Sequence, residues 1–140
     1  MSFDVLGDLN WLAVIVATVA YFAPGGLWFA SPVFGRPWIR ASGIQMPEGA
    51  PGTAFYVGPF ATCLVATIAT AMLVEATGSD TLGEGIVLGL VLGIGLALTT
   101  LFVTGIFDPK KPEPMVWFAI TGGYHLIGLL IAGGTLATWT

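Results

Sequence analysis

Charged residues are scarce in this chain. Only 9% of its 140 residues are charged, and Lys and Arg together number four, whereas about 25% of the residues of a soluble domain are charged. Such a chain has too little charge to cover a surface that faces water, and 56% of its residues are hydrophobic. The composition therefore predicts an integral membrane protein. The net charge of −4 and the lack of any basic cluster argue against a nucleic-acid partner.

Cysteine and histidine are almost missing too. The single Cys63 excludes an intramolecular disulfide, and His125 is the only histidine, so the sequence offers no ligand set typical of zinc. The glycines at 89, 93 and 95 accompany no strand or lysine, which excludes a phosphate-binding loop. No serine has a plausible base nearby, and no carboxylate lies deep in an apolar run. We expect a protein that is not an enzyme, and the sequence identifies no cofactor.

Long hydrophobic runs dominate what is present. A membrane-spanning helix needs about 20 mostly apolar residues, and four segments qualify: 9–30, 54–76, 84–107 and 115–139. Turn-forming Pro, Gly and Asp separate them. We predict an all-α integral membrane protein that forms one domain over residues 1–140, an antiparallel bundle of four transmembrane helices with short loops. The first loop is long enough for an amphipathic segment on the membrane surface, with Arg36, Trp38 and Arg40 in it.

The few charges are unevenly distributed between the loops. The first loop holds Arg36 and Arg40, and the third holds Lys110 and Lys111. With four spans these loops share a side, and the opposite side carries only acidic residues. The positive-inside rule then predicts that loops one and three are cytoplasmic and that both termini lie outside.

Four of the five tryptophans lie at the expected helix ends. We predict Trp11 and Trp139 at the outer boundary and Trp28 and Trp117 at the inner one, as aromatic belts. Residues 11 and 28 are about 26 Å apart at the helical rise, close to the hydrocarbon thickness.

Small residues mark one face of each predicted helix. In the third helix Gly85, Gly89 and Gly93 are spaced by four, and we expect Ala97, Thr100 and Thr104 to continue the stripe. Such stripes let backbones approach closely, within the bundle or, as an alternative, at a subunit contact. In the first helix, Pro24-Gly25-Gly26 predicts a kink or a break.

His125 is the polar residue expected deepest in the bilayer. It lies about 12 Å from Trp117 along the fourth helix, on a face with Thr121, Gly122, Gly128 and Ala132. One interpretation is a neutral imidazole bonded to a hydroxyl of Tyr124, Thr100 or Tyr21, and the other is a functional residue, because ionisable groups at that depth are costly. Asp108, beside the two lysines, is interpreted as part of a solvated charge cluster.

Several motifs resemble one known family. The resemblance rests on the start and end of the first helix, the glycine-spaced third helix and the fourth helix, namely Asn10-Trp11-Leu12-Ala13-Val14, Gly26-Leu27-Trp28-Phe29, Phe34-Gly35-Arg36-Pro37-Trp38, Gly105-Ile106-Phe107-Asp108 and Gly122-Gly123-Tyr124-His125-Leu126-Ile127. These stretches resemble the bacterial family catalogued as domain of unknown function 1761. The chain departs from the family pattern where Ala30 precedes Ser31-Pro32. The resemblance implies a four-helix membrane protein and no established activity, substrate or cofactor.

Three functions remain open from the sequence. The first is an accessory or scaffolding subunit in the bacterial inner membrane, which packs against itself or a larger membrane complex. The second is a small oligomeric transporter or channel with His125 and threonines along its path. The third is an enzyme that acts on a lipid or quinone with His125 as base. The candidate functional or packing residues are His125, Tyr124, Gly89, Gly93, Trp28, Arg36, Trp38 and Asp108.

Overall fold

The fold is built from four long apolar helices. The computed structural model describes residues 3–46 and 52–139, whose regular structure is entirely helical. The helices long and apolar enough to cross a membrane are α1 (Trp11–Trp28), α3 (Ala54–Thr77), the continuous rod of α4 (Leu82–Leu92), η3 (Gly93–Leu98) and α5 (Thr99–Phe107), and α6 (Pro114–Ala137). The predicted fold class is confirmed, and the predicted spans agree with these bounds to within two residues.

Three short helical elements complete the fold. A 3-10 helix, η1 (Phe3–Gly7), precedes α1, and a π-helical turn, η2 (Ser31–Gly35), leads from α1 into the short helix α2 (Arg36–Ser42). The segment predicted to be amphipathic is thus helical over most of its length.

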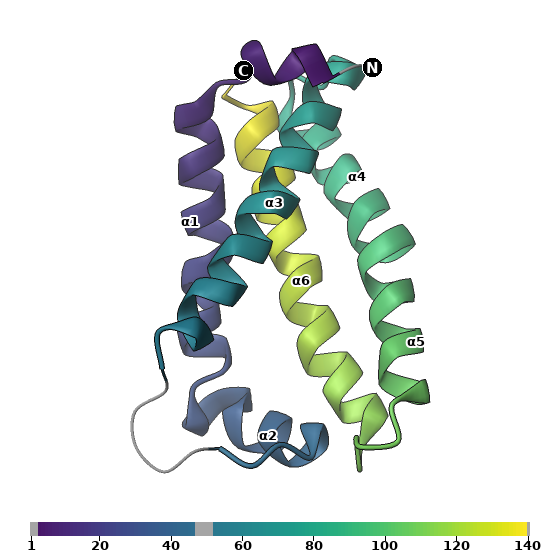
Figure 1. The fold of residues 1–140 in the computed structure, drawn as a ribbon. Coiled ribbons are helices and arrows are strands. Elements are labelled where there is room, and N and C mark those ends of the chain that lie inside the picture. The colour runs from purple at the N-terminus through teal and green to yellow at the C-terminus, as the bar shows by residue number, and fades with distance from the viewer. Residues whose placement is uncertain (1–2, 47–51, 140) are drawn as a thin grey trace.

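Helix α6 is the centre of the bundle. It contacts α1, α2, α3, α4, η3 and α5, whereas α5 has no comparable contact with α1 or α3 among the described residues. Figure 1 shows α6 running between α1 and the α4–α5 rod, with α3 crossing it diagonally. The side chains of α6 therefore decide how the helices fit together.

The two ends of the bundle differ in what they carry. The chain termini lie together at one end, where Asn10 Nδ2 donates to the carbonyl of Trp139 over 3.0 Å, and α2 and the α5–α6 connection lie at the other (Figure 1). Arg40 and Glu113 form an ion pair between α2 and that connection. All four basic residues thus lie at the α2 end, as the loop pattern predicted.

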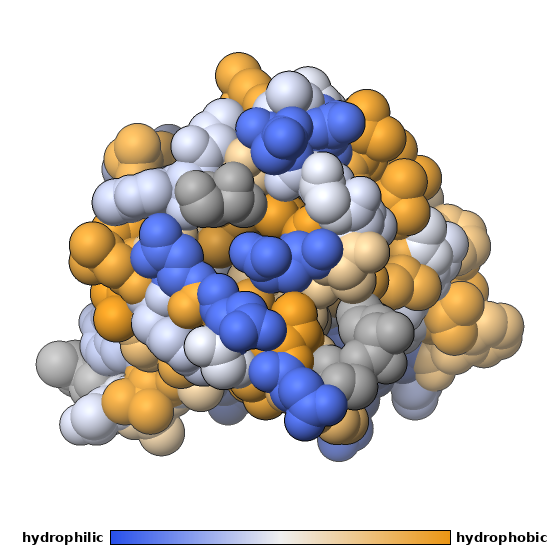
Figure 2. Space-filling view, turned by 90° about the horizontal axis from the view of Figure 1, so that it is seen from above, coloured by the Kyte–Doolittle hydropathy of each residue, from blue (hydrophilic) through white to orange (hydrophobic). Residues whose placement is uncertain are grey.

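The terminal end combines a polar centre with apolar sides. Acidic residues of this end include Asp80 and Glu84, and Thr81 with Glu84 forms a capping box at the start of α4. Seen from this end, hydrophilic residues run across the middle and hydrophobic residues project around them (Figure 2). That distribution suits a bundle whose sides face lipid and whose ends face water.

Helix ends follow their sequence signals. The side chain of Asn10 accepts a hydrogen bond from Ala13 N over 3.1 Å and so caps α1. Gly43 and Gly78 end α2 and α3 with φ of 68° and 63°, a left-handed conformation that glycine adopts without the steric cost of a Cβ. Pro24 lies inside α1, which continues to Trp28, so of the predicted kink or break, the break does not occur.

The glycine stripe of α4 packs on α6. A Cβ at Gly85 would collide with the carbonyl oxygen of Gly133, one at Gly89 would lie 2.7 Å from Leu129 O, and one at Gly93 would lie 2.5 Å from a methyl carbon of Leu126. The prediction of close packing at Gly89 and Gly93 is confirmed. Because α6 covers the stripe at these three glycines, they present no open surface to a second subunit.

The second half of the stripe differs from the prediction. Thr100 and Thr104 are exposed, and Gly105 is buried instead, with its Cα beside the ring of Trp117. The reason is the π-helical turn η3, which holds more residues per turn than an α-helix. The positions that face α6 therefore stay four residues apart, at 93, 97, 101 and 105. In an ideal α-helix, one of these intervals would have to be three residues for the positions to stay on the same face.

Candidate functional site

A cluster of polar side chains joins α1, α3 and α6 in the middle of the bundle. The Tyr21 hydroxyl lies 2.8 Å from His125 Nδ1. The Tyr124 hydroxyl donates to the carbonyl of Tyr21 over 3.2 Å, and it lies 3.6 Å from the sulfur of Cys63. We call Tyr21, Cys63, Tyr124 and His125 the mid-bundle cluster. Of the three hydroxyls expected as partners for His125, Tyr21 is the one that bonds to it.

Two glycines make room for this cluster. A Cβ at Gly128 would overlap the ring of Tyr21, and one at Gly25 would lie 3.1 Å from the Tyr124 hydroxyl. The missing side chains thus allow two tyrosine rings to lie between α1 and α6, with centroids 5.8 Å apart. Gly128 was predicted to lie on the inner face of α6, but its role in seating Tyr21 was not visible from spacing alone.

The Tyr124 hydroxyl contacts the backbone of α1 close to Pro24. Proline has no N–H, so the carbonyl of Ala20 loses its usual partner in the helix. The neighbouring carbonyls of Tyr21 and Phe22 lie 3.2 Å and 3.5 Å from the Tyr124 hydroxyl. The Tyr124 hydroxyl therefore ties α6 to the backbone of α1 beside the proline, at carbonyls other than that of Ala20. Tyr124 is therefore a packing residue of α1 as much as of α6.

The predicted tryptophans Trp28 and Trp38 also turn toward α6. Trp28 Nε1 donates to the carbonyl of Ile120 over 3.0 Å, and Trp38 Nε1 donates to Thr121 Oγ1 over 3.0 Å. Trp38 was expected on the membrane surface, and its side chain instead bonds within the bundle. Trp28 lies at the end of α1, where a belt was predicted, and bonds to α6 from there. An amphipathic pattern identifies an apolar face but does not say whether lipid or protein covers it. Trp11 and Trp139, 46% and 42% exposed, remain placed for a belt.

The charged residues at the α2 end pair with one another. Lys111 bonds to Asp108 and lies 4.5 Å above the ring of Trp117. The side chain of Lys111 is only 11% exposed, so the expectation of a fully solvated cluster was wrong for this lysine. The hydrogen bond from Lys111 lowers the pKa of the Asp108 carboxyl below its usual value. Arg36 is exposed at the start of α2 and forms no ion pair within the described part of the chain.

The predicted candidates thus fall into separate places. Tyr124 and His125 lie in the half of α6 nearer the α2 end, and Trp28 and Trp38 bond to the same half. Gly89 and Gly93 lie at the α4–α6 contact, and Asp108 and Arg36 lie at the α2 end. Sequence reasoning missed Cys63 as a neighbour of Tyr124, and the only signal was its position on the small-residue face of α3. In residues 3–46 and 52–139, no group of three or more His, Cys, Asp and Glu lies close enough to hold a metal ion.

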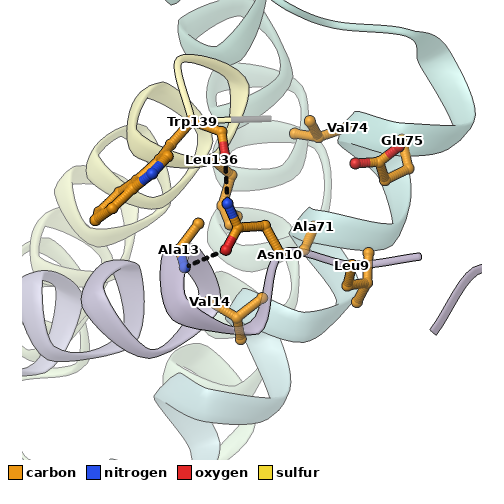
Figure 3. A pocket seen from close by; sticks show the side chains of 9 residues that line it. All are labelled: Leu9, Asn10, Ala13, Val14, Ala71, Val74, Glu75, Leu136 and Trp139. Atoms are coloured by element: carbon orange, nitrogen blue, oxygen red, sulfur yellow. Dashed lines mark hydrogen bonds between the residues drawn. The ribbon is translucent and has the colours of Figure 1, made fainter. Parts of the chain in front are cut away.

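Two hollows lie outside the mid-bundle cluster. One is a cavity of about 10 Å³ under the chain termini, about the size that holds one water molecule. Figure 3 shows its lining, with Asn10 bonded to Trp139 and to Ala13. The other is an open apolar groove along the outer half of α4 and α6, between Leu82, Ile127 and Thr138. Neither His125 nor Tyr124 lines either hollow, so both hollows are separate from the mid-bundle cluster.

Comparison with known proteins places the chain in a family. The model of a family described as protein of unknown function, DUF1761, matches residues 12–137. The match covers nearly the whole chain, so the chain belongs to this family of membrane-helix proteins, and the predicted resemblance is confirmed. No curated protein and no solved structure matches the chain.

Proposed function

We propose that this chain is a non-enzymatic multi-pass membrane protein that serves as an accessory or scaffolding subunit and packs against other membrane proteins or further copies of itself. The observation that carries this proposal is the use of the mid-bundle cluster. The Tyr21 hydroxyl bonds to His125, and the Tyr124 hydroxyl bonds to carbonyls of α1. Polar groups with these partners hold helices together, which is a structural role.

We extend the proposal to the location of the chain. The bundle has basic residues at the α2 end, including the exposed Arg36 and Arg40, and acidic residues at the end that holds the termini. By the positive-inside rule, the α2 end faces the cytoplasm and both termini lie outside, in the inner membrane of a bacterium.

A second candidate, a small oligomeric transporter or channel, is favoured by one detail of His125. Its Nδ1 is bonded to Tyr21, but its Nε2 has no hydrogen-bond partner among the described residues and is not buried. An imidazole open on one side can carry protons or line a path. A path would form only between copies, with exposed threonines such as Thr99 opposite His125.

Substitutions of His125 distinguish the two functions. Gln can accept from Tyr21 and donate outward but does not titrate, whereas Leu leaves the Tyr21 hydroxyl unpaired at a cost of about 0.6 kcal/mol. For a scaffold, we expect His125→Gln to restore the phenotype of a deletion strain and to co-purify with the same assembly in mild detergent. A well-folded His125→Gln protein that fails to complement would instead identify the transporter.

The melting temperature of each purified variant is the control for folding. Tyr56→Phe, at an exposed tyrosine of α3 outside the mid-bundle cluster, should behave as the unchanged protein in both assays. A chain that purifies alone, with no second copy and no other protein, would contradict the scaffold proposal.

A further inference from the structure

One ring nitrogen of His125 has no hydrogen-bond partner among the described residues. The Tyr21 hydroxyl has no acceptor other than His125 Nδ1 among the described residues. A phenol hydroxyl in an apolar setting uses its proton, so Tyr21 donates and the imidazole proton resides on Nε2. That nitrogen is not fully buried and has no partner among residues 3–46 and 52–139. The ring nitrogen without a partner is therefore an N–H.

The depth of His125 makes an unpaired N–H costly. His125 lies near the middle of α6, about 16 Å from its start at Pro114 and about 18 Å from its end at Ala137. A polar group without a partner in hydrocarbon is unfavourable. Lipid ester carbonyls lie near the edges of a core about 30 Å thick, so they do not reach the midplane. His125 lines neither of the two hollows described above. The acceptor is then expected on another transmembrane helix.

The outer face of the α4–α5 rod has a matching acceptor. Thr99 is exposed, and its hydroxyl donates to the carbonyl of Gly95 over 2.9 Å. With its proton used there, the Thr99 oxygen still has a lone pair free to accept. Gly95 is exposed as well, and a Cβ at Gly95 would meet nothing within 4 Å. This site thus combines an acceptor with a place where a second helix can approach closely.

The two surfaces lie at similar depths. Measured from the connection that joins α5 to α6, Gly95 lies about 18 Å and Thr99 about 12 Å into the membrane, against about 16 Å for His125. Two copies inserted in the same direction therefore bring His125 of one to the level of Gly95 and Thr99 of the other. Within one chain they do not meet, because Gly95 lies on the side of the rod turned away from α6.

We propose that a second copy of this chain docks its Gly95–Thr99 surface against His125, with Nε2–H of His125 donating to Thr99 Oγ1. This inference rests on the proposed scaffold function and names the partner. The contact joins two different surfaces, so each copy can bind one neighbour through His125 and another through its Gly95–Thr99 surface. Copies related by rotation in the plane of the membrane would then close into a ring.

The test is the oligomeric state of the full-length protein in mild detergent, measured by light scattering on a size-exclusion column. We expect an oligomer that Gly95→Leu abolishes, because a large side chain separates the two copies. Loss of one interhelical hydrogen bond in Thr99→Val or His125→Leu should weaken association about threefold. Gly58→Leu and Thr104→Val are matched controls, also exposed and with open space at Gly58, and should leave the oligomer unchanged.

A double-mutant cycle tests the specific pair. Thr99→Val combined with His125→Leu should weaken association no more than either change alone. The control Thr104→Val should leave the affinity of the His125→Leu variant unchanged. Additive losses at Thr99 and His125, a monomeric protein, or an oligomer that tolerates Gly95→Leu would each overturn the contact. A protein that purifies with other membrane proteins but without a second copy would overturn this inference and leave the scaffold function standing.

Discussion

At the scale of single residues, glycine and tyrosine act as pairs. Gly128 on α6 leaves the space that the ring of Tyr21 fills, and the hydroxyl of that ring reaches His125. The position of the imidazole thus depends on the absence of a Cβ at residue 128. The chemistry of His125 limited its partners in advance to a few hydroxyls, but the crossing of α1 and α6 selected Tyr21.

We predict that Gly128→Ala displaces Tyr21 and breaks its bond to His125. The added methyl group would overlap the tyrosine ring, and overpacking of this kind costs about 1–3 kcal/mol. The thermal melting of helicity in detergent should therefore occur at a lower temperature. Gly26→Ala, at a position with no atom within 4 Å of the new Cβ, is the control, and equal melting of the two variants would contradict the packing of Tyr21.

Gly43 and Gly78 offer a second comparison between residues. Both have a positive φ, but a Cβ at Gly43 would also collide with the carbonyl oxygen of Lys110, whereas one at Gly78 meets nothing. We expect Gly78→Ala to cost about 1–2 kcal/mol from the backbone alone. Gly43→Ala should cost more, because α2 must also move away from the α5–α6 connection. The order of the two melting temperatures checks this prediction, and the reverse order would disprove the contact.

At the scale of elements, the spans were predictable and their faces were only partly so. Length and hydropathy define a span, and these properties are read directly from residues such as 84–107. The π-helical turn η3 is different, because no residue type requires it, and it moved Thr100 and Thr104 out of the predicted stripe. Trp38 was misplaced for a related reason, since its sequence pattern fits either a lipid surface or the underside of α6.

Deletion of one residue in η3 tests the origin of that register. Removing the exposed Ile94 should convert η3 to α-helix and keep both Gly93 and Gly105 against α6, because a π-helical turn holds one residue more than the α-helix needs. We expect this variant to fold and to melt close to the unchanged protein. Removing Val91, also exposed but placed between Gly89 and Gly93, should break the spacing of the stripe and destabilise the bundle. Equal losses would show that η3 does not set the register.

At the scale of the whole molecule, the basic residues and the chain termini lie at opposite ends of the axis of the helix bundle. Basic residues gather at the α2 end, and the termini with their acidic neighbours occupy the opposite end (Figure 1). The contacts Arg40–Glu113 and Asn10–Trp139 hold the loops of each end together. The loop pattern was sufficient to predict this division, because it needs only the number of spans and the positions of four basic residues.

The direction of this axis in the membrane is testable by labelling single cysteines. In a Cys63→Ala background, Lys110→Cys should react only with reagents that reach the cytoplasm, and Asp80→Cys should react with impermeant reagents added outside. Lys110 suits this purpose because it is exposed, whereas Lys111 is mostly covered by Asp108 and Trp117. The physical reason is the cost of moving basic loops across the membrane during insertion. Labelling of both positions from one side would contradict the four-span topology, and labelling with the sides exchanged would reverse the orientation and place the termini in the cytoplasm.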